Sequence, residues 1–150
     1  MLNRTFFSLA LATALSGCSS YSGTIPDRPV QNDIDGCLEQ LANDSDEVLF
    51  IEIPVAPNFL ANAVFTGIAS VSKTAEAVSQ TLRGARGRAV MIYGANEGNN
   101  TAMLRAALKT LPEARDRGEI CLTATPERGK TLQPLASSRG YELILTREGI

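Results

Sequence analysis

Four short apolar runs, each separated from the next by a helical pattern, constrain the fold of this 150-residue chain more than any other feature. The runs are rich in aliphatic and β-branched residues, which is typical of buried strands; they cover residues 48–53, 88–93, 119–124 and 141–146. Apolar residues recur with helical spacing between them, over residues 58–82, 101–111 and 131–139. Thr131 is the expected N-cap of the last helix.

This alternation predicts an α/β fold. We expect a small layered sandwich of about four mainly parallel strands in the order β-α-β-α-β-α-β, preceded by a short helix over residues 33–41 that Asp33 caps. The length fits one domain. The pattern leaves the strand order open, and it allows the last strand to be antiparallel at an edge.

The composition excludes several classes of function. The chain has no His, so it cannot form a Ser-His-Asp triad or a His-ligated metal site by itself. Its formal net charge of −2 argues against a nucleic-acid binder, which needs a basic face. The loop at residues 94–100 contains no G-K-[ST], and no G-x-S-x-G elbow occurs in the chain. We therefore expect no catalytic residue, no metal and no cofactor, although an unrecognised hydrolase stays open.

The chain begins like an exported protein. Arg4 precedes roughly ten mostly apolar residues, which is the pattern of a secretory signal peptide. The segment ends in Leu15-Ser16-Gly17-Cys18, which resembles the lipobox of bacterial lipoproteins. The resemblance implies that residues 1–17 are removed and that Cys18 receives the acyl chains that bind the membrane. The alternative is an ordinary signal peptide with a chance Cys.

The same resemblance indicates a location. Ser19, rather than Asp, follows the lipidated Cys, and this favours the outer membrane facing the periplasm if the source is Gram-negative. Residues 18–32 contain Ser, Gly and Pro without periodicity and are interpreted as a flexible tether. Residues 33–150 then form a single periplasmic α/β domain.

Two further thiols, Cys37 and Cys121, remain in the predicted mature chain. An even pair in an oxidising compartment favours one disulfide. That bond would fasten the first helix to the third strand. Two buried inert thiols, or one reactive thiol, are the alternatives.

Two loops follow strands at the edge where α/β proteins commonly bind ligands. They cover residues 54–58 and 94–100, and a crevice between them is the candidate ligand site. Its candidate residues are Gly94, Asn96, Glu97, Gly98, Asn99, Asn100 and Thr101. Asn99, Asn100 or Thr101 can cap the following helix, so the alternative is a capped turn without a ligand. Glu97 has no evident partner for acid–base chemistry.

Arg83, Arg86 and Arg88 form a basic cluster, interpreted either as a solvated loop beside a helix C-terminus or as a contact for anionic lipid or an acidic partner. The apolar stripe of residues 58–82 is interpreted as core, with a groove for a partner helix or a face on a membrane surface as the alternatives. Together the patterns predict an envelope lipoprotein held by acyl chains on Cys18, with a noncatalytic role in binding an envelope protein. Small-ligand binding is the second hypothesis.

Overall fold

The computed structural model describes residues 28–41, 47–55, 73–85 and 87–147. Four strands and six helical segments follow one another in chain order. They are α1 (Arg28–Gln40), β1 (Val48–Glu52), α3 (Lys73–Gly84), β2 (Ala89–Tyr93), α4 (Glu97–Thr110), β3 (Gly118–Leu122), α5 (Pro126–Gly129), the 3₁₀ turn η2 (Lys130–Leu132), α6 (Gln133–Ser138) and β4 (Tyr141–Leu145).

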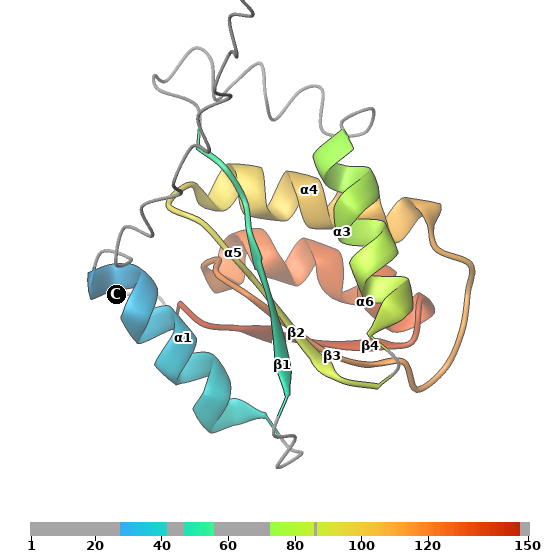
Figure 1. The fold of residues 1–150 in the computed structure, drawn as a ribbon, viewed down its shortest axis with the longest axis horizontal. Coiled ribbons are helices and arrows are strands. Elements are labelled where there is room, and N and C mark those ends of the chain that lie inside the picture. The colour runs from blue at the N-terminus through green and yellow to red at the C-terminus, as the bar shows by residue number, and fades with distance from the viewer. Residues whose placement is uncertain (1–27, 42–46, 56–72, 86, 148–150) are drawn as a thin grey trace, which may run out of the picture.

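The strands form one sheet in the order β1-β2-β3-β4, and every neighbouring pair is parallel. The predicted α/β sandwich is therefore confirmed, and the last strand is parallel at its edge. Crossovers between parallel strands are right-handed, so strands added in one direction place their crossover helices on the same face. Figure 1 shows this arrangement: α3, α4 and α6 lie on one side of the sheet and α1 on the other.

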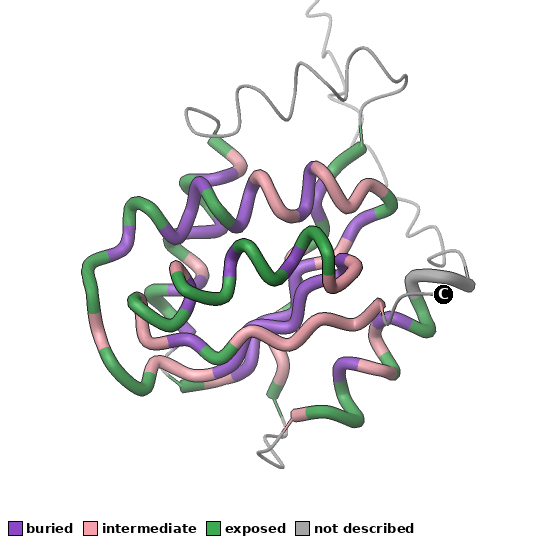
Figure 2. The backbone as a smooth tube through the Cα atoms, turned by 180° about the vertical axis from the view of Figure 1, so that it is seen from behind, coloured by how far each residue is buried: buried purple, intermediate pink, exposed green. Residues whose placement is uncertain are grey.

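The crossover helices cover the larger core. Side chains alternate along a strand, so Val90 and Ile92 of β2 point to this face together with Ile120 and Leu122 of β3. Leu104 of α4 belongs to the same cluster and is fully buried. In Figure 2, buried residues concentrate in the central strands and along the inner sides of the helices.

The opposite face carries a smaller cluster under α1. Met91 of β2 and Cys121 of β3 point to it, and both are fully buried, as is Cys37 of α1. Cys37 and Cys121 form a disulfide with their Cα atoms 5.8 Å apart, which confirms the predicted pairing. The bond connects α1 directly to an inner strand of the sheet.

Three helix starts differ from the prediction. Helix α1 begins at Arg28, so residues 28–32 belong to it and not to a tether, and Asp33 lies inside the helix instead of capping it. Helix α4 begins at Glu97, four residues before the predicted start. Thr131 lies in the η2 turn rather than at an N-cap.

Of the long helix predicted over residues 58–82, the structure describes the part that belongs to α3; residues 58–72 lie outside the described residues. Within α3 the apolar stripe is core, because Ala75, Val78 and Leu82 are buried in the larger cluster.

Candidate functional site

The turn after β2 is organised by Asn96. Its side-chain Oδ1 accepts a hydrogen bond of 3.0 Å from the Asn99 backbone N–H, and its backbone oxygen accepts one from the Asn100 N–H. These bonds satisfy donors that the first turn of a helix otherwise leaves unpaired. The N-cap of α4 is therefore Asn96, and the predicted caps Asn99, Asn100 and Thr101 lie within the helix.

Asn100 holds two strand ends together. Its side chain is fully buried, and its Nδ2 donates at 3.0 Å to the backbone oxygens of Gly94, after β2, and of Thr123, after β3. Its Oδ1 has no hydrogen-bond partner. A Cβ on Gly94 would lie 2.7 Å from this oxygen and 2.6 Å from the Ile53 backbone oxygen. Only Gly allows so close an approach of the two loops.

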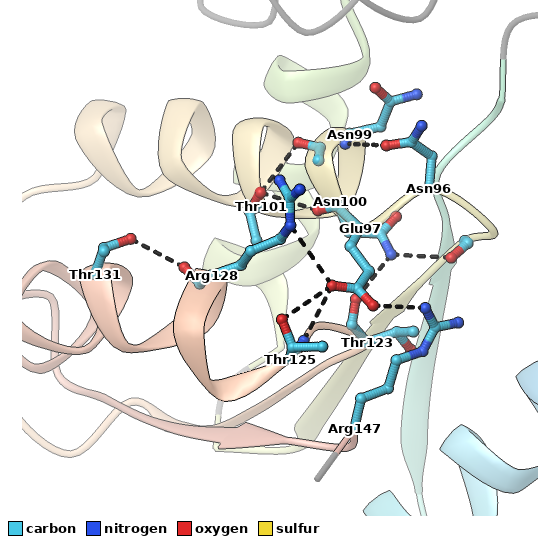
Figure 3. Close-up of polar contacts among 12 residues, drawn as sticks. Asn96, Glu97, Asn99, Asn100, Thr101, Thr123, Thr125, Arg128, Thr131 and Arg147 are labelled. Carbon is cyan, nitrogen blue, oxygen red and sulfur yellow. Dashed lines mark hydrogen bonds and ion pairs between the residues drawn. The ribbon is translucent and has the colours of Figure 1, made fainter. Parts of the chain in front are cut away.

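Glu97 is the centre of a polar network at the carboxyl edge of the sheet (Figure 3). Arg147, just after β4, donates from Nη1 to Glu97 Oε1 at 2.7 Å and contacts Asp33 Oδ2 of α1 at 3.2 Å. Thr125 donates its backbone N–H and its hydroxyl to Glu97 Oε2, each at 3.2 Å. The exposed Arg128 lies 3.8 Å from the same carboxylate oxygen.

The charges of this network support one another. Burial alone would raise the pKa of Glu97, but the hydrogen bonds from Arg147 and Thr125 outweigh it and hold the pKa below the ordinary 4.5. Burial likewise opposes the charge on Arg147, yet Glu97 and Asp33 raise the pKa of its guanidinium. Glu97 is therefore an ionised, fully engaged carboxylate, and Arg147 is the partner that the sequence did not reveal.

The predicted ligand residues are thus brought together, but most serve the fold. Thr101 donates its hydroxyl to backbone oxygens of Glu97 and Gly98, within its own helix. Of the facing loop at residues 54–58, residues 56–58 lie outside the described residues. The sequential strand order contains no reversal, so the described sheet has no topological switch point of the kind at which α/β proteins bind ligands. Ligand binding between these loops stays a prediction.

A second region stands out for its exposed apolar side chains. Phe50 of β1, Leu38 of α1 and Val55 after β1 are 51%, 47% and 46% exposed. Phe50 shares a strand face with Val48, which packs into the cluster under α1, so Phe50 lies at the border of that cluster. Its ring makes an edge-to-face contact with Tyr93, with centroids 6.5 Å apart. We call Leu38, Phe50 and Val55 the α1–β1 surface.

Carboxylates accompany the α1–β1 surface. Residues 29–72 contain no Lys, Arg or His. Among their described side chains, the exposed ionisable groups are all acidic: Asp35, Glu39, Glu47 and Glu52. Glu47 pairs with Arg88 at 3.1 Å. The exposed carboxylates therefore belong to the same elements as the exposed apolar side chains, namely α1, β1 and the residues beside β1.

The arginines of the predicted basic cluster, at the amino edge of the sheet, have separate partners. Arg88 donates to the backbone oxygens of Gly84 and Ala85 at the end of α3, which is the helix C-terminal role expected for it. Arg83 donates to the Thr110 oxygen at the end of α4. Arg86 lies outside the described residues.

Among the described residues we also looked for a metal site and for a membrane-spanning helix. There, no three His, Cys, Asp or Glu side chains gather as metal ligands would. No helix among the described segments has the length and apolar character needed to cross a bilayer.

These features define a small α/β domain in which a disulfide attaches one helix to the sheet. Exposed apolar side chains and carboxylates occur on α1 and beside it on β1, and a network of ionised side chains lies at the carboxyl edge of the sheet. Comparisons with known proteins add no relative: no family model matches the chain, and neither does any curated protein or solved structure.

Proposed function

We propose that this protein is a lipid-anchored envelope lipoprotein whose α1–β1 surface binds a protein partner in the periplasm. The lipobox-like segment supports the anchor at Cys18 and the outer-membrane location. Cys18 lies ten positions before Arg28, where α1 begins. The α1–β1 surface is therefore the part of the domain that follows the anchor most closely along the chain.

One observation carries the binding role. The three large apolar side chains that are exposed among the described residues all belong to α1, β1 and the residues directly after β1. Exposed apolar side chains that occur singly need no explanation, but a concentration with a polar border is typical of interaction sites. An aromatic residue such as Phe50 contributes large contact area to such a site.

The charges specify the chemistry of the partner. Exposed carboxylates at Asp35, Glu39 and Glu52 oppose docking onto an anionic lipid surface, and they attract a basic protein. We therefore propose a partner segment that places an apolar side chain against Phe50 and Lys or Arg beside the carboxylates.

Site-specific photo-crosslinking tests this role. A photoreactive phenylalanine at position 50, in the full chain at native level in membranes, should yield one defined adduct. The matched control places the same group at Gln133, an exposed residue of α6 on the opposite side of the sheet. A Glu39→Lys, Glu52→Lys double variant should weaken the adduct. Equal labelling from both positions, or none from position 50, would contradict the proposal.

The anchor is tested separately. Cys18→Ala should release or mislocalise the protein, and wild type should incorporate a palmitate analogue and fractionate with outer membranes. Ser19→Asp should retain the protein at the inner membrane of a Gram-negative source. Unlabelled wild-type protein would exclude the lipoprotein assignment without affecting the partner surface.

The alternative, a small ligand between residues 54–58 and 94–100, makes a different prediction. A metabolite, glycan fragment or nucleotide should then raise the melting temperature, and substituting Asn96 and Asn99 by Ala should remove that rise. A screen in which no compound shifts the melting temperature would eliminate this alternative.

A further inference from the structure

A cavity of about 270 Å³ opens at the amino edge of the sheet, at the opposite end from the Glu97 network. Residues from the end of α3, the turn before β2, the turn before β3 and the start of β4 line it. They are Leu82, Arg83, Gly87, Asp116, Arg117 and Tyr141.

The two arginines of this cavity keep most of their hydrogen-bonding capacity. Each guanidinium has five N–H donors. Arg83 donates from Nη2 to the Thr110 oxygen, and Arg117 makes a long 3.4 Å bond to the Pro112 oxygen and also interacts with the Tyr141 side chain. The Nε of Arg117 is buried without a hydrogen-bond partner.

Neither arginine has a carboxylate partner among the described residues. Other arginines do: Arg88 pairs with Glu47, Arg139 with Glu113, and Arg147 with both Asp33 and Glu97. Two guanidiniums without a carboxylate partner therefore line the same cavity, and their remaining N–H groups can donate to an anion placed there.

The cavity is built on a fixed frame. Tyr141 donates its hydroxyl to the Leu82 oxygen at 2.8 Å. The backbone N–H of Arg117 donates to the Gly140 oxygen at 2.7 Å. A Cβ on Gly118, whose φ is +125°, would lie 3.2 Å from the Gly87 oxygen, so the turns before β2 and β3 are in close contact. The arginine side chains therefore extend from backbone that is held from both sides.

We propose that this cavity binds a phosphate group through Arg83 and Arg117. Arginine's planar fork matches phosphate oxygens and is the usual choice for such recognition. The volume lies slightly below the range of about 300–1,000 Å³ for drug-sized ligands, so the ligand is a small phosphate ester or the phosphate of a lipid headgroup. Leu82 and the Tyr141 ring supply apolar contact for its carbon atoms.

Asp116 provides an internal control. Its carboxylate also lines the cavity and repels an anion, so its neutralisation should strengthen phosphate binding. Its φ of +53° lies in the left-handed region that Asn tolerates nearly as well as Gly, so Asp116→Asn changes the charge without new backbone strain.

The test uses the full chain in maltoside micelles and records the ¹⁵Nε–¹Hε signals of its arginines. Inorganic phosphate should shift the Arg83 and Arg117 signals saturably, beyond any change from chloride at equal ionic strength. Arg117→Gln and Arg83→Gln should each weaken binding about tenfold or more. Arg115→Gln, an exposed neighbour that does not line the cavity, should leave affinity unchanged, and Asp116→Asn should strengthen it roughly two- to fivefold.

The source of the phosphate is decided in a second arm. Glycerol 3-phosphate represents a soluble ester, and nanodiscs of phosphatidylglycerol represent a lipid headgroup; a shift of the Arg117 signal by either supports the site and names its source. Parallel shifts of all arginine signals, or no saturable shift with phosphate, glycerol 3-phosphate and nanodiscs, would overturn the proposal. Because wild-type protein gives the decisive reading, a variant that fails to fold does not obscure it.

Discussion

On one face of the sheet, α3, α4, η2 and α6 bury a continuous apolar cluster, whereas on the other face one helix of the described residues, α1, lies over a small cluster with a disulfide at its centre. The first face is stabilised by the amount of apolar area removed from water. The second buries too few side chains to hold a 13-residue helix that is marginal alone, and a covalent bond compensates. The comparison teaches that, among the described residues, apolar burial holds one face of the sheet and a covalent bond holds the other.

Among the changes that test this comparison, breaking the disulfide should cause the largest loss in the free energy of unfolding. The bond joins residues separated by 84 positions, and Cys37→Ser or Cys121→Ser should lower the free energy of unfolding by about 2–5 kcal/mol. Urea denaturation measures this loss. Hydrogen exchange should show that α1 amides lose protection before those of α4.

Nonreducing electrophoresis of wild-type protein provides the control and should show one intramolecular bridge. Equal protection of α1 in wild type and Cys37→Ser would mean that packing alone holds the helix, against our interpretation of that face.

A matched pair of cavity substitutions should sharpen the same contrast. Leu104 and Met91 are both fully buried, one on each face. Leu104→Ala should cost about 2–5 kcal/mol, because the surrounding core cannot collapse into the space. Met91→Ala should fall at or below the low end of that range, because the thinner layer under α1 can adjust. Thermal denaturation checks both, and a larger loss for Met91→Ala would reverse our ranking of the two faces.

The smallest expected effect concerns the network that joins the faces. Arg147 contacts Asp33 of α1 on one side and Glu97 of α4 on the other, and Arg147→Gln should cost about 1–3 kcal/mol near neutral pH. The folded state lowers the pKa of Glu97, so this carboxyl contributes stability above its ordinary pKa of 4.5 and loses it as the pH falls toward the folded value.

A series of urea midpoints between neutral and acidic pH measures this dependence. Wild type should lose stability more steeply below pH 4.5 than Arg147→Gln, because without the arginine only the Thr125 hydrogen bonds oppose burial and the pKa of Glu97 is lowered less. Arg139→Gln, which removes an arginine paired with an exposed carboxylate, is the control and should keep the wild-type slope. Identical slopes for wild type and Arg147→Gln would show that the network does not set the acid sensitivity.

The sequence carried enough information for the sheet but not for every helix start. Strand runs such as residues 88–93 are short, mostly apolar and bounded by glycines, so their length and flanking residues, rather than a period, identify them as strands. The start of α1 was missed because Pro29 favours a loop interpretation, although proline is also tolerated in the first helical turn. The start of α4 was missed because Gly98, Asn99 and Asn100 are poor helix formers inside a helix, whereas Asn96 caps them here.

The contacts of the polar network could not be predicted from the sequence, for a different reason. Asp33, Glu97 and Arg147 belong to three distant parts of the chain, and no spacing rule relates them. The Cys37–Cys121 pairing could be predicted because only one bond is possible between the two thiols that remain after Cys18. Phe50 looked like one more core residue of an apolar run, but β1 is an edge strand of the sheet and the side chain is half exposed.

The disulfide also determines how this domain would carry mechanical load. A pull applied through Cys18 enters α1 and crosses from Cys37 directly to Cys121, so residues 38–120 lie outside the covalent path under tension. Strands β1 and β2 and helices α3 and α4 are within that bypassed loop. A load between the anchor and a point after Cys121 would therefore leave these elements unstretched, whereas a load between the anchor and a partner on Phe50 would pass into the loop and end on β1.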